Sequence, residues 1–364
     1  MSDHSIYVMP ARERDEWDKK IAHVGQNVFS SFRYNLCAIA GKDNFFVLRN
    51  DGDAPPVVFF RMLPHRVEIL HLYSRFSSAE IRSICQFIFD MFAHVRSIGF
   101  ECIESGFGPV GFVVQQYNFS EDFVIDLCGS VEQYSNRLGK QLRSDLKRFR
   151  KKLYSEFSDV RYECVCGQEA SESAFNEIIG FSASRMAIKL ATSSHTMERS
   201  RRLFELVKSF GLLFLIYIDG KVRAGVICTL YGNDMFMHVV AHDPRFDRFR
   251  LGKLACYGSI CAAIERGAVR YHLLSGWYDY KVRFLGRQVE FDRLEVYRSI
   301  GSGFLACDRY LYIFFRGNGR RVKRYLRSRG ITTPGWLSQA HAVRMVLGRM
   351  AAPVRWLGRL RRRS

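Results

Sequence analysis

The sequence predicts a mixed α/β fold in which mixed, mostly antiparallel sheets are flanked by helices. Short apolar segments alternate with segments of helical periodicity through most of the chain. Asp-Gly at 219–220 and Gly-Asn-Asp at 232–234 separate apolar runs, which is typical of tight turns between antiparallel strands. A chain of 364 residues exceeds the size that one hydrophobic core usually fills, so we expect more than one domain.

Residues 1–128 read as a first half-domain of strands around one helix, with no evident chemistry. Ser77 and Glu80 have the spacing of a capping box, and apolar residues recur at helical spacing from Ile81 to Val95, so we expect a helix that Gly99 ends. The expected strands are Phe45–Leu48, Val57–Met62, Val67–Leu72, Phe100–Glu104, Phe112–Gln116 and Phe123–Leu127.

Residues 129–155 predict one basic connecting helix. Ser130 and Gln133 mark its start, and its periodicity continues to about Leu153. One face is apolar and the others carry cations, with Arg143 and Arg148 as candidates for binding a substrate. Two interpretations stay open at this point: a solvated connector, or one wall of a groove for an anionic substrate or carrier.

Residues 156–308 predict a second domain with a definite order of elements. Two helices precede three antiparallel strands, and a strand–helix–strand unit follows, for which a right-handed crossover gives parallel pairing. The expected elements are helices at Glu172–Arg185, Thr196–Phe210, Gly252–Arg266 and Tyr278–Leu285, and strands at Leu212–Ile218, Val222–Tyr231, Met235–Ala241, Val269–Leu274 and Val289–Tyr297.

A fold with this order of elements can bind a phosphate-bearing carrier that holds an acyl group. An exposed strand edge can bind a pantetheine arm by main-chain hydrogen bonds. The helix start at Gly252 offers free N–H groups to a pyrophosphate, and Arg248, Arg250 and Lys253 add positive charge beside it. We therefore predict acetyl-CoA or a longer acyl-CoA as co-substrate.

Acyl transfer also needs a base and a group that protonates the leaving atom. His238, and His242 with Asp243, are the candidates for the base, although a lone histidine on a strand is more often a core residue. Tyr280 is a candidate to protonate a leaving thiolate, and Lys281 to pair with phosphate or substrate. No serine or cysteine triad emerges, which favours direct transfer without a covalent enzyme intermediate.

On these residues the chain resembles the GNAT superfamily of acyltransferases. The closest resemblance is to CelD-type acetyltransferases, which are related to FemAB-like proteins with paired GNAT domains. It is carried by Phe123–Leu153, Leu215–Gly267 and Tyr271–Gly286. The resemblance implies tandem GNAT-like domains and an acyl-CoA-dependent N- or O-acyltransferase, often associated with surface polysaccharide or envelope assembly.

The sequence departs from the family pattern at the phosphate loop. Phe249 and Leu254 stand where that loop has polar or small residues, and the acidic residue ahead of the Tyr-Lys pair is Asp279, a candidate for substrate binding. Two further hypotheses remain. The basic helix favours a FemAB-like ligase that takes its acyl group from aminoacyl-tRNA, and the departures favour a non-catalytic membrane or nucleic-acid adaptor.

The excess of positive charge is local. The chain has a net charge of +19, and residues 316–364 hold 14 Lys or Arg and no acid. From Trp336 to Arg363, apolar residues that include Trp336 and Trp356 alternate with arginines. This pattern predicts that residues 309–364 form a basic amphipathic tail that binds an anionic membrane surface, with nucleic acid as a less favoured partner.

The remaining composition argues for a protein of the cytoplasm that carries no metal. The cysteines have no zinc-cluster spacing, and no signal peptide or membrane span is evident. We therefore expect no metal, a cytoplasmic location that includes the inner face of the membrane, and a small-molecule, sugar or lipid-linked acceptor. The oligomeric state is not indicated.

Overall fold

The computed structural model describes residues 4–8, 45–50, 58–188 and 197–305, together with residues 311 and 313. The chain divides into two compact units, Met1–Cys307 and Asp308–Ser364. The expected basic tail at 309–364 lies almost wholly outside the described residues, so it stays a prediction. Among the described residues, no helix is long and apolar enough to cross a membrane.

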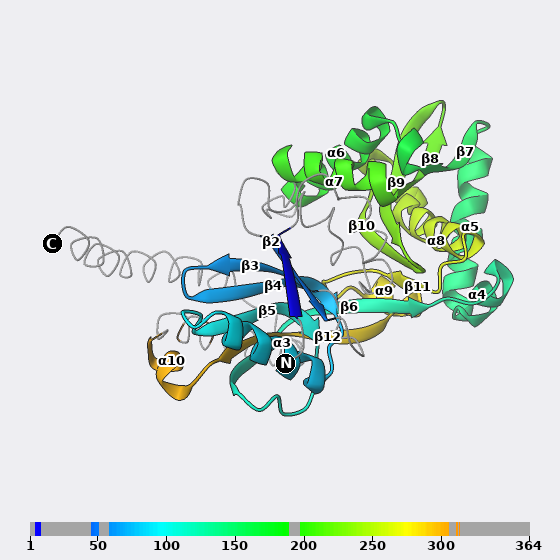
Figure 1. Cartoon of the computed structure of the whole chain (residues 1–364). Coiled ribbons are helices and arrows are strands. Elements are labelled where there is room, and N and C mark those ends of the chain that lie inside the picture. The colour runs from blue at the N-terminus through cyan, green and yellow to red at the C-terminus, as the bar shows by residue number, and fades with distance from the viewer. Residues whose placement is uncertain are drawn as a thin grey trace. The chain divides into compact units, whose positions relative to one another are not determined.

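The described strands of the first unit form one twelve-stranded mixed sheet, which confirms the predicted fold class (Figure 1). Its order is β1-β2-β3-β4-β5-β12-β6-β11-β10-β9-β8-β7. The strands are β1 His4–Val8, β2 Phe45–Asn50, β3 Val58–Leu63, β4 Arg66–Ser74, β5 Ser97–Glu104, β6 Val113–Asp126, β7 Val160–Cys166, β8 Gly211–Ile218, β9 Lys221–Tyr231, β10 Asp234–His242, β11 Arg270–His272 and β12 Arg287–Tyr297.

The sheet has a two-fold internal pattern about its central pair, β12 and β6. Moving outward on one side, β5 pairs antiparallel with β12 and parallel with β4; on the other side, β11 pairs antiparallel with β6 and parallel with β10. All the remaining outer pairs are antiparallel. Each half therefore contains the same unit of antiparallel strands followed by a parallel crossover.

The two halves exchange strands at the centre. The long β6 of the first half pairs with β11 of the second, and β12, the last strand of the second half, lies between β5 and β6 of the first. Figure 1 shows β6 and β12 running together between the two groups of helices. The strands expected at Phe112–Gln116 and Phe123–Leu127 are one continuous strand, because β12 pairs along nearly all of it.

The helix of the first half is α3, Ser78–Met91, and its capping box at Ser77 and Glu80 is confirmed. The expected end at Gly99 was wrong. The helix stops at Phe92, and Gly99 lies inside β5, where its missing side chain leaves room for the Arg66 guanidinium. The apolar core of this half lies between α3 and the sheet, while the opposite face carries ion pairs such as Arg66 with Glu295.

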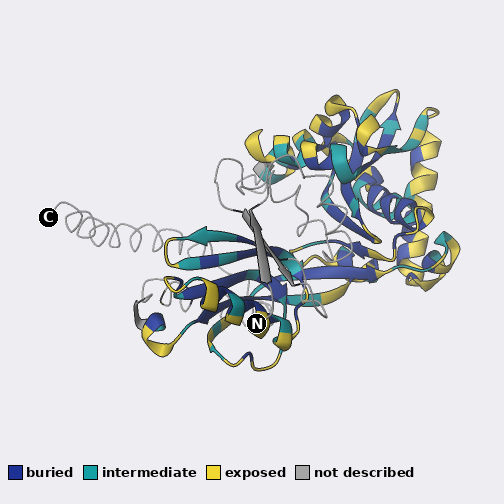
Figure 2. Ribbon diagram, in the orientation of Figure 1, coloured by how far each residue is buried: buried dark blue, intermediate teal, exposed yellow. Residues whose placement is uncertain are grey.

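The second half is a three-layer sandwich. Helices α4 Val131–Arg137, α5 Lys140–Glu156 and α8 Leu251–Glu265 pack over one core, and α6 Glu172–Ile188 and α7 Met197–Phe210 pack over the other face of β8, β9 and β10. Successive residues of β8 point alternately into these two cores, as Leu212 and Leu213 do. In Figure 2 the strands between the layers are largely buried, whereas α5 is exposed along much of its length.

The expected single basic helix at 129–155 is two helices. Ser130 caps α4 by accepting from Gln133 N, and the chain then turns at Leu138, whose backbone is extended and whose side chain is buried in the core. Gly139 precedes the new helix α5. Burying Leu138 thus interrupts the helix, a tertiary effect that helical periodicity does not reveal.

Candidate functional site

The candidate site is built where β10 and β11 separate. Only Asp234–Phe236 of β10 pair with Arg270–His272 of β11, and β10 then continues to His242. On its other edge β10 has a bulge at His238, where the register to β9 shifts between Met237 and Val239. A bulge leaves one residue out of the ladder and turns the strand. The separation leaves a strand edge that suits an extended ligand such as a pantetheine arm.

The short helix α9, Asp279–Arg283, places Lys281 beside this separation. Lys281 is buried, 2% exposed, and its Nζ donates to the Leu274 carbonyl at 2.7 Å and the Ser275 carbonyl at 2.9 Å. Both carbonyls belong to the segment that follows β11. Burial lowers the pKa of Lys281 to about 8, although the negative charges of Asp122 and Glu121 act against that shift. Lys281 is therefore a buried amine that can exchange a proton near neutral pH.

Tyr280 is partly buried beside the same segment, with its ring 6.4 Å from that of Phe284. Burial raises the pKa of Tyr280, so its hydroxyl stays protonated at physiological pH. Cys256 of α8 acts electrostatically on both Tyr280 and Lys281, which places the pair next to α8. Asp279 instead points to solvent and forms an ion pair with Arg283 at 2.6 Å.

His238 makes a 2.8 Å hydrogen bond between its Nε2 and Thr229 Oγ1 of β9. Burial lowers the pKa of His238 to about 4, so the ring is neutral and a weak base at physiological pH. These surroundings suit a residue that anchors the bulge better than they suit a general base.

His242 and Asp243 shape the approach to α8. His242 Nε2 lies 2.7 Å from Asp247 Oδ1, and a Cβ added to Gly252 would lie 3.1 Å from His242 Nδ1. Asp243 is buried, caps the 3-10 helix η3 (Pro244–Phe249) and pairs with Arg223 and Arg245. Hydrogen bonding from Arg245 lowers the pKa of Asp243. Both oxygens of Asp243 are occupied, which favours a role in holding the loop over one as a base.

The predicted phosphate-binding residues meet at the start of α8. Arg250 has a left-handed backbone (φ 53°) and precedes the helix, whose first turn has no side-chain cap. Arg248 is exposed, pairs with Glu156 and lies 4.7 Å from the centre of the Phe249 ring. Lys253 lies 5.7 Å from the Phe149 ring. An uncapped helix start beside three cations fits a phosphate group.

The basic helix α5 packs against the start of α8 and the preceding helix η3. Its Lys152 lies 5.5 Å from the Phe249 ring. Arg143 is exposed, while Arg148 pairs with Asp145 at 2.7 Å and lies over Phe149. The two sequence departures are explained here, because Phe249 and Leu254 are buried in the core that joins these helices. The structure therefore brings α5 and the predicted phosphate loop together.

A buried group of charged residues at the sheet centre was missed by the sequence reasoning. His272 of β11 lies between two carboxylates: its Nδ1 is 2.6 Å from Asp122 Oδ2 of β6, and its Nε2 is 3.7 Å from Asp234 Oδ2 of β10. Arg270 donates to both oxygens of Asp234. The only sequence signal is a set of polar residues inside or beside apolar strands.

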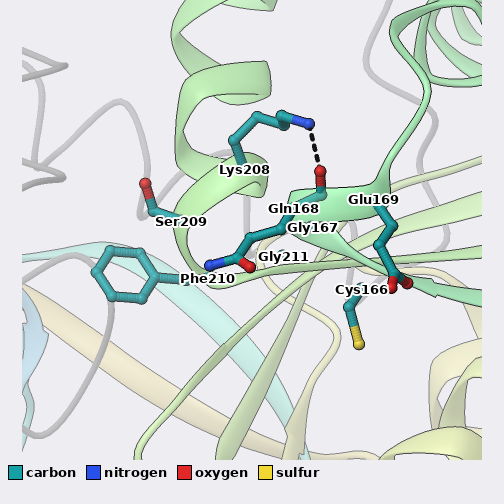
Figure 3. Close-up of a pocket in the computed structure, with 8 residues that line it drawn as sticks. All are labelled: Cys166, Gly167, Gln168, Glu169, Lys208, Ser209, Phe210 and Gly211. Carbon is teal, nitrogen blue, oxygen red and sulfur yellow. Dashed lines mark hydrogen bonds between the residues drawn. The ribbon is translucent and has the colours of Figure 1, made fainter.

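A separate hollow of about 240 Å³ lies where β7 meets the 3-10 helix η2 (Gly167–Glu169) and where α7 meets β8. Figure 3 shows Lys208 reaching across to the Gln168 carbonyl, to which its Nζ donates at 2.6 Å. A Cβ on Gly167 or Gly211 would collide with the Val207 backbone. None of the candidate residues lines this hollow, and we assign it no function.

No group of three or more His, Cys, Asp or Glu suited to a metal occurs among the described residues. The cysteines of the described ranges are free thiols. Burial raises the pKa of the Cys228 thiol to about 12, so it is not a nucleophile at physiological pH.

Comparisons with known proteins agree with this architecture. Residues 140–282, from the start of α5 to α9, match the model of the acetyltransferase (GNAT) domain. No protein in the curated set matches the chain.

The solved structures that resemble the chain share its fold at low sequence identity. FemX matches with a TM-score of 0.59 and 11% identity over 79% of this chain and 96% of FemX. The structure of L-PGS from Bacillus licheniformis matches with a TM-score of 0.52 and 12% identity over 81% of this chain and 96% of that one.

The C-terminal domain of a putative lysylphosphatidylglycerol synthetase from Agrobacterium fabrum also matches, with a TM-score of 0.51 and 12% identity over 82% of this chain and 96% of that domain. At these identities the likeness concerns the fold. Residues 140–282 are thus similar to the GNAT acetyltransferase domain, and the fold around them resembles that of FemX.

Proposed function

We propose that this protein is an acyltransferase that moves an acyl group directly from a phosphate-bearing carrier to an amine or hydroxyl acceptor. One observation carries the proposal: β10 and β11 separate beside Lys281 and Tyr280, and β10 leads through η3 into a cationic, uncapped helix start. The match of residues 140–282 to the GNAT domain supports the same reaction class.

Acetyl-CoA or a longer acyl-CoA is the carrier that best fits the start of α8. Arg248, Arg250 and Lys253 would bind its phosphates, together with the free N–H groups at the start of α8. When bound, the carrier supplies its acyl group as a thioester. The open edge of β10 beyond Phe236 would align the pantetheine arm.

Lys281 and Tyr280 would then serve the transfer itself. The ammonium of Lys281 uses two N–H groups on carbonyls, which leaves a third to stabilise the oxyanion formed when the acceptor attacks the acyl carbon. As the carbon–sulfur bond breaks, the Tyr280 hydroxyl protonates the sulfur and regains a proton from the acceptor. The acceptor thus loses one proton and the thiol gains one.

The test is an acyl-transfer assay that measures release of free CoA thiol with acetyl-CoA and longer acyl-CoAs over a panel of amine and hydroxyl acceptors. We expect Lys281→Met to lower kcat about 100-fold, as loss of an oxyanion donor does. Lys221→Met, at the exposed start of β9, is the matched control and should leave kcat unchanged. Absence of acyl-CoA binding in isothermal titration would overturn the proposal for this carrier.

A second candidate is a FemAB-like ligase that takes its acyl group from aminoacyl-tRNA. Helix α5 favours it, because exposed cations continue along the helix beyond what one pyrophosphate needs. Reversing the stripe Arg143, Lys147 and Lys151 to Glu should raise KM about 10-fold for a tRNA donor, since several phosphate contacts are lost. Binding of CoA should change little. The matched control reverses three exposed cations outside the stripe, Arg75, Arg201 and Lys221, to Glu.

The acceptor and the cellular setting belong to the proposal as well. The CelD-type resemblance favours a sugar or lipid-linked acceptor in envelope assembly, reached from the cytoplasmic face of an anionic membrane by the tail at 309–364. The competing adaptor hypothesis predicts that a Tyr280→Phe, Lys281→Ala variant keeps its biological activity. Loss of that activity in a folded double variant supports the enzyme.

A further inference from the structure

His272 and its partners cross three neighbouring strands at the point where the halves exchange. Asp122 lies on β6, His272 on β11 and Asp234 on β10, and all three residues are buried. The His272 ring also stacks on Phe236, with 4.3 Å between ring centres and 18° between planes. A buried imidazole that stacks on a ring and binds a carboxylate through Nδ1, with a second carboxylate 3.7 Å from Nε2, has a fixed orientation.

The surroundings of the imidazole favour its charged form more than water does. Burial lowers the pKa of His272, but the hydrogen bond to Asp122 and the negative charges of Asp122 and Asp234 outweigh burial, so the net shift of the pKa is upward. Arg270 pairs with Asp234 from the other side and lowers the pKa of that carboxyl, as His272 also does. Negative and positive groups thus alternate from Asp122 to Arg270.

Both oxygens of Asp122 are committed within this group. Oδ1 accepts from Phe123 N at 2.7 Å, and Oδ2 accepts from His272 Nδ1 at 2.6 Å. Asp122 nevertheless acts on Lys281 by its charge. The Lys281 ammonium is bound by the Leu274 and Ser275 carbonyls, two and three residues past His272. Leu273 N donates to the Phe123 carbonyl, which ties this segment to β6.

We propose that His272 is a positioning residue for Lys281: by holding the Asp122 carboxylate it keeps that group out of an ion pair with the Lys281 ammonium, and it fixes the carbonyls that bind Lys281. This inference rests on the proposed role of Lys281 in acyl transfer. Without the imidazolium, Asp122 would turn to Lys281, and the third N–H of Lys281 would no longer be available to an oxyanion.

The charged groups that face the two residues predict opposite effects of two substitutions. Asp122, Asp234 and Arg270 surround His272, and Asp122, Glu121 and the Cys256 thiol act on Lys281. His272→Gln removes a positive charge and frees Asp122, so the pKa of Lys281 should rise. Asp122→Asn removes the negative charge, so the pKa of Lys281 should fall.

The experiment is an NMR titration of the full chain labelled with ¹³C at the lysine side chains, with the Lys281 signal assigned by its loss in Lys281→Arg. We expect a wild-type midpoint at about 8, a higher midpoint in His272→Gln and a lower one in Asp122→Asn. His94→Gln, at an exposed position of the first half, is the control and should not move the midpoint.

Midpoints that stay at the wild-type value in both variants, or that move in the same direction, would overturn the inference. If His272→Gln does not fold, Asp234→Asn replaces it. That variant removes one carboxylate that raises the pKa of His272 and should raise the Lys281 midpoint by a smaller amount. The titration needs no substrate, so it separates this inference from the acyltransferase proposal; where transfer is measured, its pH profile should shift with the same sign.

Discussion

At the scale of single residues, the charged group around His272 should govern how the stability of the protein depends on pH. The pKa of His272 is raised in the folded protein. Its stabilising contribution is therefore fully present below the pKa of an unfolded histidine and is lost as pH rises through the folded pKa. Breaking a buried ion pair costs about 3 kcal/mol, so His272→Gln should be destabilised most at low pH.

Urea unfolding of wild type and His272→Gln between about pH 5 and about pH 9 measures this dependence. The difference in unfolding free energy should shrink as pH rises. A difference that is constant across the range, or one that grows with pH, would show that His272 is not held charged. His94→Gln serves again as the control and should follow the wild-type curve.

The sequence indicates Tyr280 and Lys281 as candidates but gives no sign of the pairing of His272, and the reason is the range of the interactions. Lys281 binds carbonyls that are six and seven residues away in the sequence, so this contact is local. His272 and Asp122 are 150 residues apart, so their pairing depends on the order of strands in the sheet. The positions that the sequence placed in the phosphate loop and on α5 are brought together, while their chemical roles stay predictions.

At the scale of elements, α8 packs closely against β8 because a glycine, Gly258, lies at their contact. A Cβ at Gly258 would lie 2.1 Å from Cζ of the buried Phe214 ring, so Gly258→Ala should destabilise the protein by about 1–3 kcal/mol through overpacking. Gly180→Ala, in α6, meets no atom within 4 Å and should be neutral or stabilising by up to about 1 kcal/mol.

Chemical denaturation of the two alanine variants compares them directly. Equal stability of Gly258→Ala and Gly180→Ala would mean that α8 can shift away from β8 at little cost. A shift of that kind would also move Cys256 and the groups of α9 beside it, so acyl transfer measured on the same samples gives a second readout.

Most elements could be predicted from local pattern, and the failures have tertiary causes. The antiparallel strands β8, β9 and β10 lie within a residue or two of the ranges expected from their turns, because a turn residue acts locally. The long β6 and the break between α4 and α5 escaped prediction. The first depends on β12 as a partner, and the second on burial of Leu138.

At the scale of the molecule, strand exchange should make the first unit, Met1–Cys307, unfold as one cooperative body. Each half lacks a central strand unless the other is folded, because β12 completes one and β6 the other. Hydrogen exchange followed by mass spectrometry should give the same opening free energy for peptides of β4–β5 and of β9–β10.

The test of this cooperativity uses one destabilising variant in the second half. Gly258→Ala, in the second half, should lower protection of β4 and β5 as much as that of β9 and β10. Loss confined to the second half would show that the halves open independently. The sequence indicated that the halves share an α/β plan, but not that they share strands, since pairing partners leave no mark in hydrophobic periodicity.

The place of β12 also constrains the order of events on the ribosome. β5 and β6 have been translated long before Arg287 emerges, yet the strand that separates them in the finished sheet is β12. The nascent first half must therefore keep the gap between β5 and β6 open, or pair them provisionally and part them later. Two exposed strand edges during synthesis are an aggregation hazard, which makes expression yield sensitive to translation speed and to chaperones that cover such edges.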